Sequence, residues 1–291
     1  MSTSLQGLVS SPLAVPASRY DFEQLAHIYN EARVDYIVPM PMNAPRMEAY
    51  VREHDVDLDA SVVLLNSAGE PIGVGMLGLR DRRGWITRLG ILPACRGYKG
   101  GEFITRKLIQ HAGERGVELI QLEVIQGNEP ATRLFLKLGF EQTRELLVIR
   151  RPPGQPHADL PVPDSRVTPM EPGEALACLE RRPPGASWIE ETPSLLKAGK
   201  LKGLRVELPA GQGGWMVYQG TLFQLAHFVM QLPDDAIEET AYALLYALHH
   251  QHPAQDTKVE NIPANEIPWR AFQALGYVEA FRRIEMVLTL P

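Results

Sequence analysis

A short stretch of the chain combines two cationic side chains with three glycines, a set of residues suited to binding phosphate. Its members are, in order, Arg96, Gly97, Tyr98, Lys99, Gly100 and Gly101. Glycine lets backbone N–H groups come close to an anion, and a helix start and two cations add positive charge. Taken alone, the stretch is also compatible with a plain connection between two elements.

The elements on either side would hold this stretch in place. Residues 85–92 include β-branched and aromatic side chains, which predicts a strand. Ile104, Leu108 and Ala112 then recur at helical spacing up to a stop signal at Gly116. The stretch contains neither G-x-x-x-x-G-K-[ST] nor G-x-G-x-x-G, so the sequence excludes two well-known nucleotide-binding loops.

This stretch resembles motif A of the GNAT superfamily of N-acetyltransferases, whose signature is [RQ]-x-x-G-x-[GA]. Arg96 and Gly101 match the first and last signature positions, whereas Lys99 stands where the middle glycine belongs. The resemblance implies that the stretch holds the pyrophosphate of acetyl-CoA, with Leu89 and Ile91 of the preceding strand beside the cofactor. Lys99 would either pair with the phosphates or crowd them, and we favour pairing because its side chain is long and flexible.

A second motif of the same family follows, in which a strand leads to N-x-x-A and then to a helix that ends in [FY]-x-K-L-G-F. Residues 117–125 are strand-like, and the matching positions are Asn128, Ala131, Phe135, Lys137, Leu138, Gly139 and Phe140. The resemblance implies that Asn128 and Phe135 contribute to the cofactor site. The same residues also suit an ordinary N-capped helix that ends at a glycine, and the two interpretations are compatible.

The resemblance further implies direct transfer of an acetyl group to a primary amine, on a small molecule or a peptide N-terminus. A strand N–H would polarise the thioester carbonyl, and no metal is implied. Many members use a tyrosine as general acid at the position of Phe135, which has no hydroxyl. Glu123, on the strand-like run 117–125, is the candidate general base. A glutamate at the equivalent place in the second half of the chain, Glu260, favours a structural role instead.

The second half of the chain repeats the first at a constant distance of 137 residues. Glu123, Asn128, Glu129, Arg133, Phe135, Leu138 and Gly139 recur as Glu260, Asn265, Glu266, Arg270, Phe272, Leu275 and Gly276. This repeat predicts two copies of one fold, with a helix over 236–252. In the second copy, Pro233, Ile237 and Glu238 stand where Arg96, Gly100 and Gly101 stand in the first. Because an acid at this place repels an anion, we predict that the second copy has no CoA loop.

The remaining hydrophobic patterns predict the other elements of the first copy. Helices are expected over 21–32 and 46–54, strands over 13–16, 62–66 and 71–80, and a last strand over 145–150. The loop between the two helices lies on the acceptor side of the cleft in the GNAT fold. Tyr36, Met40 and Met42 are therefore candidates for substrate contact, and they suit a loop that covers a core equally well.

The proline-rich run 151–164 predicts an extended linker and a domain boundary. The fold class is therefore α/β (α+β), with two tandem GNAT-like domains, each a mixed, mostly antiparallel sheet flanked by helices. The expected domains are 1–155, an acetyltransferase domain that binds acetyl-CoA, and 156–291, a degenerate copy without the CoA loop. We expect either a monomer with pseudo-twofold domains or a homodimer.

Composition narrows the class of protein. The chain has 291 residues and a net charge of −6, which argues against binding to nucleic acid or to an anionic membrane. It has no apolar run near the ~20 residues of a membrane helix, and no signal peptide is recognised. Cys95 and Cys178 are expected to be free thiols, as in a reducing compartment. These features predict a cytoplasmic protein.

Three functions from different classes remain open. The first is an N-acetyltransferase with its chemistry in the first domain. The second is a CoA-binding protein without turnover, which Phe135 and Lys99 favour. The third is an interaction module built from a tandem GNAT fold, although such a module has no need of the cationic, glycine-rich stretch.

Overall fold

A computed structural model describes residues 13–291 and divides the chain into two compact units. Unit 1 comprises Met1–Thr143 and Ile284–Pro291, and unit 2 comprises Arg144–Arg283. Residues 1–12 lie outside the described part of the chain. Within the described part of the chain, no helix is long and apolar enough to cross a membrane.

The elements of unit 1 follow the predicted order. They are β1 (Leu13–Pro16), η2 (Ala17–Arg19), α1 (Phe22–Glu31), α2 (Ala44–Glu53), β2 (Val56–Leu65), β3 (Pro71–Arg80), β4 (Arg83–Ile91), η3 (Pro93–Cys95), α3 (Gly100–Glu114), β5 (Leu119–Ile125) and α4 (Glu129–Lys137). Strands β1 to β4 pair antiparallel in sequence order, and β5 then pairs parallel with β4. The unit is thus a mixed, mostly antiparallel sheet, as predicted.

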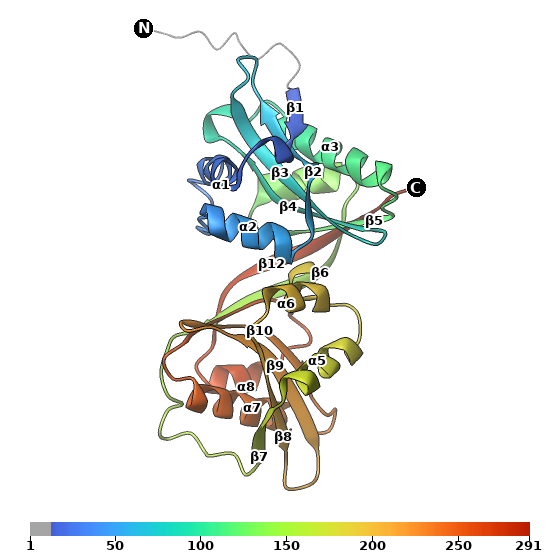
Figure 1. The fold of residues 1–291 in the computed structure, drawn as a ribbon. Helices are drawn as coiled ribbons and strands as arrows, with labels where there is room; N and C mark the ends of the chain where they lie inside the picture. Colours follow the sequence, from blue (N-terminus) through green and yellow to red (C-terminus); the bar gives the residue numbers. More distant parts are fainter. Residues whose placement is uncertain (1–12) are drawn as a thin grey trace. The chain divides into compact units, whose positions relative to one another are not determined.

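Helices cover both faces of this sheet (Figure 1). Neighbouring side chains of a strand point to opposite faces, so Val62 and Leu64 of β2 enter one core while Val63 enters the other. The first core packs against α3 and α4, and the second packs against α1 and α2. An Asp21–Gln24 capping box fixes the start of α1.

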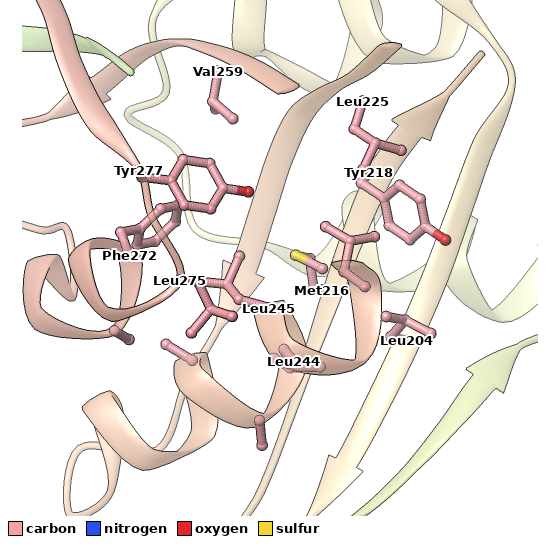
Figure 2. Packing of buried hydrophobic residues seen from close by; sticks show 14 of the residues in the cluster. Leu204, Met216, Tyr218, Leu225, Leu244, Leu245, Val259, Phe272, Leu275 and Tyr277 are labelled. Carbon is pink, nitrogen blue, oxygen red and sulfur yellow. The ribbon is translucent and has the colours of Figure 1, made fainter. Parts of the chain in front are cut away.

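Unit 2 repeats this architecture. The elements that lie wholly or partly in it are β6 (Glu141–Arg151), β7 (Arg166–Met170), α5 (Pro172–Arg181), η4 (Trp188–Glu190), α6 (Thr192–Ala198), β8 (Leu201–Glu207), β9 (Gly213–Gly220), β10 (Gln224–Gln231), α7 (Ile237–Gln251), β11 (Asp256–Pro263), α8 (Trp269–Ala274) and β12 (Val278–Thr289). Strands β7 to β10 pair antiparallel in order, and β11 pairs parallel with β10. Figure 2 shows the core under α7 and α8.

The 137-residue register of the repeat is confirmed for the segment from α3 to the glycine after α4. Helix α7 begins and ends 137 residues after α3, and β11 begins 137 residues after β5. Gly139 and Gly276, which follow the last helix of each copy, both have left-handed φ values, +92° and +85°. A side chain would be strained in this conformation, which explains why glycine recurs there.

The unit boundary differs from the expected division at 155/156, because each unit is completed by a segment from the other half of the chain. Strand β6, expected to close the first fold, pairs with β11, and its Ile149 is fully buried in the core of unit 2. Conversely, the end of β12 belongs to unit 1, where Met286 is fully buried and Leu290 N–H donates to Glu118 O. The proline-rich run 151–164 lies within unit 2, and it does not reveal which core the neighbouring strands join.

Candidate functional site

Strands β4 and β5 are paired only near their starts. Within the described chain, their ladder joins Arg83 to Leu119, Gly84 to Ile120 and Trp85 to Gln121, and the strands then diverge. Strand β4 also has a bulge against β3 at Arg88, whose φ is +51°. A bulge takes backbone polar groups out of the ladder and makes them available to other partners. The diverging strands lead directly to the turn that precedes α3.

This turn has the backbone of a glycine loop even where glycine is missing. Gly97 has a φ of +88°, and Lys99 has a φ of +60° and caps α3 in the left-handed conformation. Phe103 N–H donates to Lys99 O, so the amides between them precede the first hydrogen bond of the helix. Lys99 therefore takes the conformation that a glycine would adopt, and its exposed side chain has no ion-pair partner among residues 13–291.

The guanidinium of Arg96 is already bound by the protein. It makes two hydrogen bonds of 2.7 Å to the carboxylate of Asp35 and donates to Ala32 O and Ile91 O. The hydrogen bonds from Arg96 hold the pKa of Asp35 below its ordinary value. Arg96 thus ties the end of α1 to the loop, and Asp35 neutralises its charge. Among the described residues, no carboxylate neutralises Lys99, which therefore carries the free positive charge of this loop.

An acidic side chain in the first turn of α3 is also neutralised. Glu102 accepts from Lys137 Nζ at 2.6 Å and from Arg106 at 2.9 Å. These hydrogen bonds hold the pKa of Glu102 below its ordinary value, and the bond from Lys137 has the larger effect. Lys137, part of the second motif, therefore joins α4 to α3 and removes a negative charge that would repel an anion at the helix start.

On the opposite face of the sheet, aromatic side chains surround the candidate base. Glu123 Oε2 accepts from Trp85 Nε1 at 2.8 Å, and the ring of Tyr50 lies 6.0 Å from that of Trp85. The guanidinium of Arg88 lies 4.0 Å from the centre of the Tyr50 ring, and Tyr50 Oη is 2.5 Å from Thr87 Oγ1. Burial raises the pKa of Tyr50 to about 12, so its hydroxyl stays protonated at neutral pH.

The other residues predicted to bind the cofactor differ in their contacts and in their burial. Asn128 caps α4 by accepting from Ala131 N–H and donates to Tyr36 Oη at 3.3 Å, which links the α1–α2 loop to α4. Phe135 is buried, with its ring 5.7 Å from that of Phe140. The half-buried side chains of Leu89 and Ile91 pack on the core under α3, whereas Tyr98, in the turn, is exposed.

Some contacts of the site were not predicted from the sequence. Asp35 lies 61 residues before Arg96 on a loop without periodicity, so no local pattern indicates their pairing. Trp85 and Thr87 could have been found, because alternation along β4 places them together on the face opposite Ile86. Among the described residues, no group of histidine, cysteine or acidic side chains could hold a metal ion.

Residues 22–140 match the model of the acetyltransferase (GNAT) family. This match covers both motifs and the elements that hold them, from α1 to the end of α4. Residues 22–140 therefore form a domain similar to the GNAT family of acetyltransferases, a class of acyl-transferring proteins.

Solved structures share the fold over almost the whole chain. A GCN5-related N-acetyltransferase from Sphaerobacter thermophilus is 18% identical with a TM-score of 0.71, covering 97% of this chain and 96% of that one. A tandem GNAT protein from the clavulanic acid biosynthesis pathway is 16% identical with a TM-score of 0.65, covering 96% and 98%. A glucosamine N-acetyltransferase region of a fungal multi-domain β-N-acetylglucosaminidase is 12% identical with a TM-score of 0.70, covering 95% and 38%. The tandem architecture is thus shared over both units.

Proposed function

We propose that unit 1 is an N-acetyltransferase that moves an acetyl group from acetyl-CoA directly to a primary amine. The observation that carries this proposal is the divergence of β4 from β5 after Trp85 and Gln121, in front of a left-handed turn and the start of α3. A narrow thioester arm fits between two separated strands, and a diphosphate fits at free helix amides.

The residues of the turn suit the diphosphate of acetyl-CoA. A Cβ at Gly100 would lie 3.2 Å from side-chain atoms of both Ile91 and Leu64, so glycine allows the helix start to pack closely here. The amides before Phe103 would donate to the phosphates, and Lys99 would add its charge. Acetyl-CoA supplies the activated acetyl group, and backbone N–H groups at the β4 bulge would polarise its carbonyl.

Glu123 would remove the proton of the incoming ammonium, directly or through water, because a protonated amine is not a nucleophile. The hydrogen bond from Trp85 would hold its carboxylate on the face opposite α3. Phe135 cannot donate a proton to the leaving thiolate, so water would do so. The acceptor would be a small-molecule amine or a peptide N-terminus, and the glucosamine N-acetyltransferase region among the similar structures acts on an acceptor of the first kind by its description.

Release of free CoA thiol from acetyl-CoA, measured over a panel of amines and peptide N-termini, tests this function. We expect amine-dependent release, and we expect Glu123→Gln to lower kcat/KM on the order of 100-fold while CoA binding stays unchanged. CoA binding without thiol release from any amine would instead favour the second candidate, a CoA-binding protein without turnover, which the missing hydroxyl at Phe135 suggests. Absence of both binding and release would contradict both candidates.

A further inference from the structure

Unit 2 has a cavity at the place where unit 1 has its phosphate loop. The cavity has a volume of about 710 Å³ and is lined by the first turns of α7, by α8, by the β8–β9 turn and by the linker from Pro161 to Asp164. This volume lies in the range of small-molecule sites. Tyr242 Oη donates to Pro161 O at 2.7 Å, which holds the linker wall against α7.

Two shortened side chains account for the empty space. At the 137-residue offset, Leu134 and Lys137 of α4 correspond to Ala271 and Ala274 of α8, and both alanines line the cavity. In unit 1, Leu134 Cδ2 comes within 3.4 Å of an ideal Cβ on Gly101, and Lys137 reaches across to α3. Replacement of both by alanine leaves a space next to the helix start.

The replacement of Lys137 by alanine, together with that of Arg106, also leaves a carboxylate without its cations. Glu239 corresponds to Glu102, and the two cations that neutralise Glu102, Lys137 and Arg106, correspond to Ala274 and Ala243. In the part of the chain that the structure describes, Glu239 makes no ion pair. The remaining charged lining consists of Asp164, Asp235, Glu238 and Arg270, so negative charge dominates the cavity.

The arrangement of these acids favours an organic cation over a metal ion. No group of acidic or histidine side chains in residues 13–291 converges closely enough to hold a metal, so the carboxylates are spread over the cavity. The walls between them are formed by proline, leucine and alanine side chains. A ligand that matches this lining has a positively charged end and an apolar body.

We propose that this cavity binds a small organic amine, with the ammonium group paired to Glu239 and the apolar part against Ala271 and Ala274. The ammonium takes the place that the Lys137 ammonium has beside Glu102 in unit 1. Acidic residues thus convert a site that would bind an anionic cofactor into one that binds a cation. This inference requires neither CoA binding nor turnover in unit 1.

Calorimetric titration of the full-length protein with hexylamine, hexan-1-ol and hexanoate tests the proposal. We expect hexylamine to bind at least tenfold more tightly than the alcohol or the acid, and the binding to weaken as salt increases. Equal binding of hexan-1-ol, or no binding of hexylamine, would overturn the proposal.

Variants assign the binding to this cavity rather than to the acceptor site of unit 1. Glu239→Gln should weaken hexylamine binding at least tenfold, and Ala274→Lys should abolish it because an internal ammonium then occupies the site. Glu180→Gln, which removes an exposed acid of α5 outside the cavity lining, should have no effect. Ala274→Lys should also raise the melting temperature, because the new lysine pairs with Glu239. The melting curve therefore shows independently that this variant is folded. Unchanged hexylamine binding in Glu239→Gln and Ala274→Lys would place the amine elsewhere and overturn the proposal, whether or not unit 1 transfers acetyl groups.

Discussion

The first turns of α3 and α7 lie at the same point in two copies of one fold, but their chemistry is opposite. In α3, Gly101 leaves room for an anion, and Glu102 is neutralised by cations. In α7, Glu238 replaces the glycine and Glu239 has lost its cations. Helix length, register and core are retained throughout. The comparison teaches that the apolar positions specify this fold, whereas a few polar positions at one helix start specify its ligand.

The largest expected effect comes from Gly101→Glu, which makes unit 1 resemble unit 2. A Cβ at this position would meet Leu134 at an ordinary contact distance of 3.4 Å, so the fold should persist. A carboxylate ~4 Å from a phosphate costs on the order of 4 kcal/mol near a surface. We therefore expect calorimetry to show at least a 100-fold loss of CoA affinity, while Gly101→Ala, without charge, binds normally. Near-native binding by the glutamate variant would show that the loop is assigned wrongly.

The second comparison concerns β6 and the end of β12, each of which completes the unit formed mainly by the other half of the chain. Met286 is far from unit 1 in sequence but fully buried in its core, and Ile149 is fully buried in unit 2. Truncation of either side chain to alanine should cost about 2–5 kcal/mol of unfolding free energy. We expect Met286→Ala to weaken CoA binding as unit 1 loses stability, and Ile149→Ala to leave CoA binding unchanged. The reverse outcome, read from chemical denaturation and calorimetry, would contradict the observed division of the chain.

Acid should destabilise unit 2 before unit 1. His249 Nε2 is 2.8 Å from Tyr277 Oη in the core of unit 2, and the equivalent residues of unit 1 are Ala112 and Phe140. Burial, then the nearby charges of Arg151 and His252, lowers the pKa of His249 to about 3.

The unfolded chain therefore takes up a proton below pH 6.5 that the folded unit refuses. The stability contributed by His249 is complete above pH 6.5 and decreases by about 1.4 kcal/mol per pH unit toward pH 3. We expect denaturation curves to show this slope for unit 2, and we expect His249→Leu with Tyr277→Phe to remove it. An unchanged slope in the double variant would assign the acid sensitivity to other groups.

The smallest expected effect concerns Lys99, whose left-handed backbone suits glycine better than lysine. Lys99→Gly should raise the stability of unit 1 by up to about 1 kcal/mol. It should also weaken CoA binding several-fold and reduce its salt dependence, because the positive charge is lost. Lys99→Arg serves as the control that retains the charge. Tighter binding by the glycine variant would mean that Lys99 crowds the phosphates.

Features set by local patterns could be predicted from the sequence. The spacing of Ile104, Leu108 and Ala112 predicted α3, and the 137-residue repeat predicted α7 within one residue at each end. The order of strands also followed from alternation and turn residues. Spacing and alternation are strong signals because they depend on neighbours only a few residues apart, and the repeat is strong because many residues match at one offset.

Features that depend on distant residues could not be predicted in the same way. Residues 145–150 contain an apolar run typical of a strand, but such a run does not specify the partner strand, and this one joined unit 2. Arg96 matched a phosphate-loop signature, yet its guanidinium is held by Asp35 on a loop with no regular pattern. The partner strand of residues 145–150 and the partner of Arg96 both depend on the tertiary structure, which no pattern of neighbouring residues specifies.

The most direct test of the account is a calorimetric titration of the full-length protein with acetyl-CoA. The two helix starts are equivalent in fold, but only that of α3 has the glycines and the unpaired Lys99 that an anion requires. We expect one acetyl-CoA to bind per chain. Two equivalent sites per chain would contradict it, because α7 would then bind the cofactor despite Glu238 and Glu239.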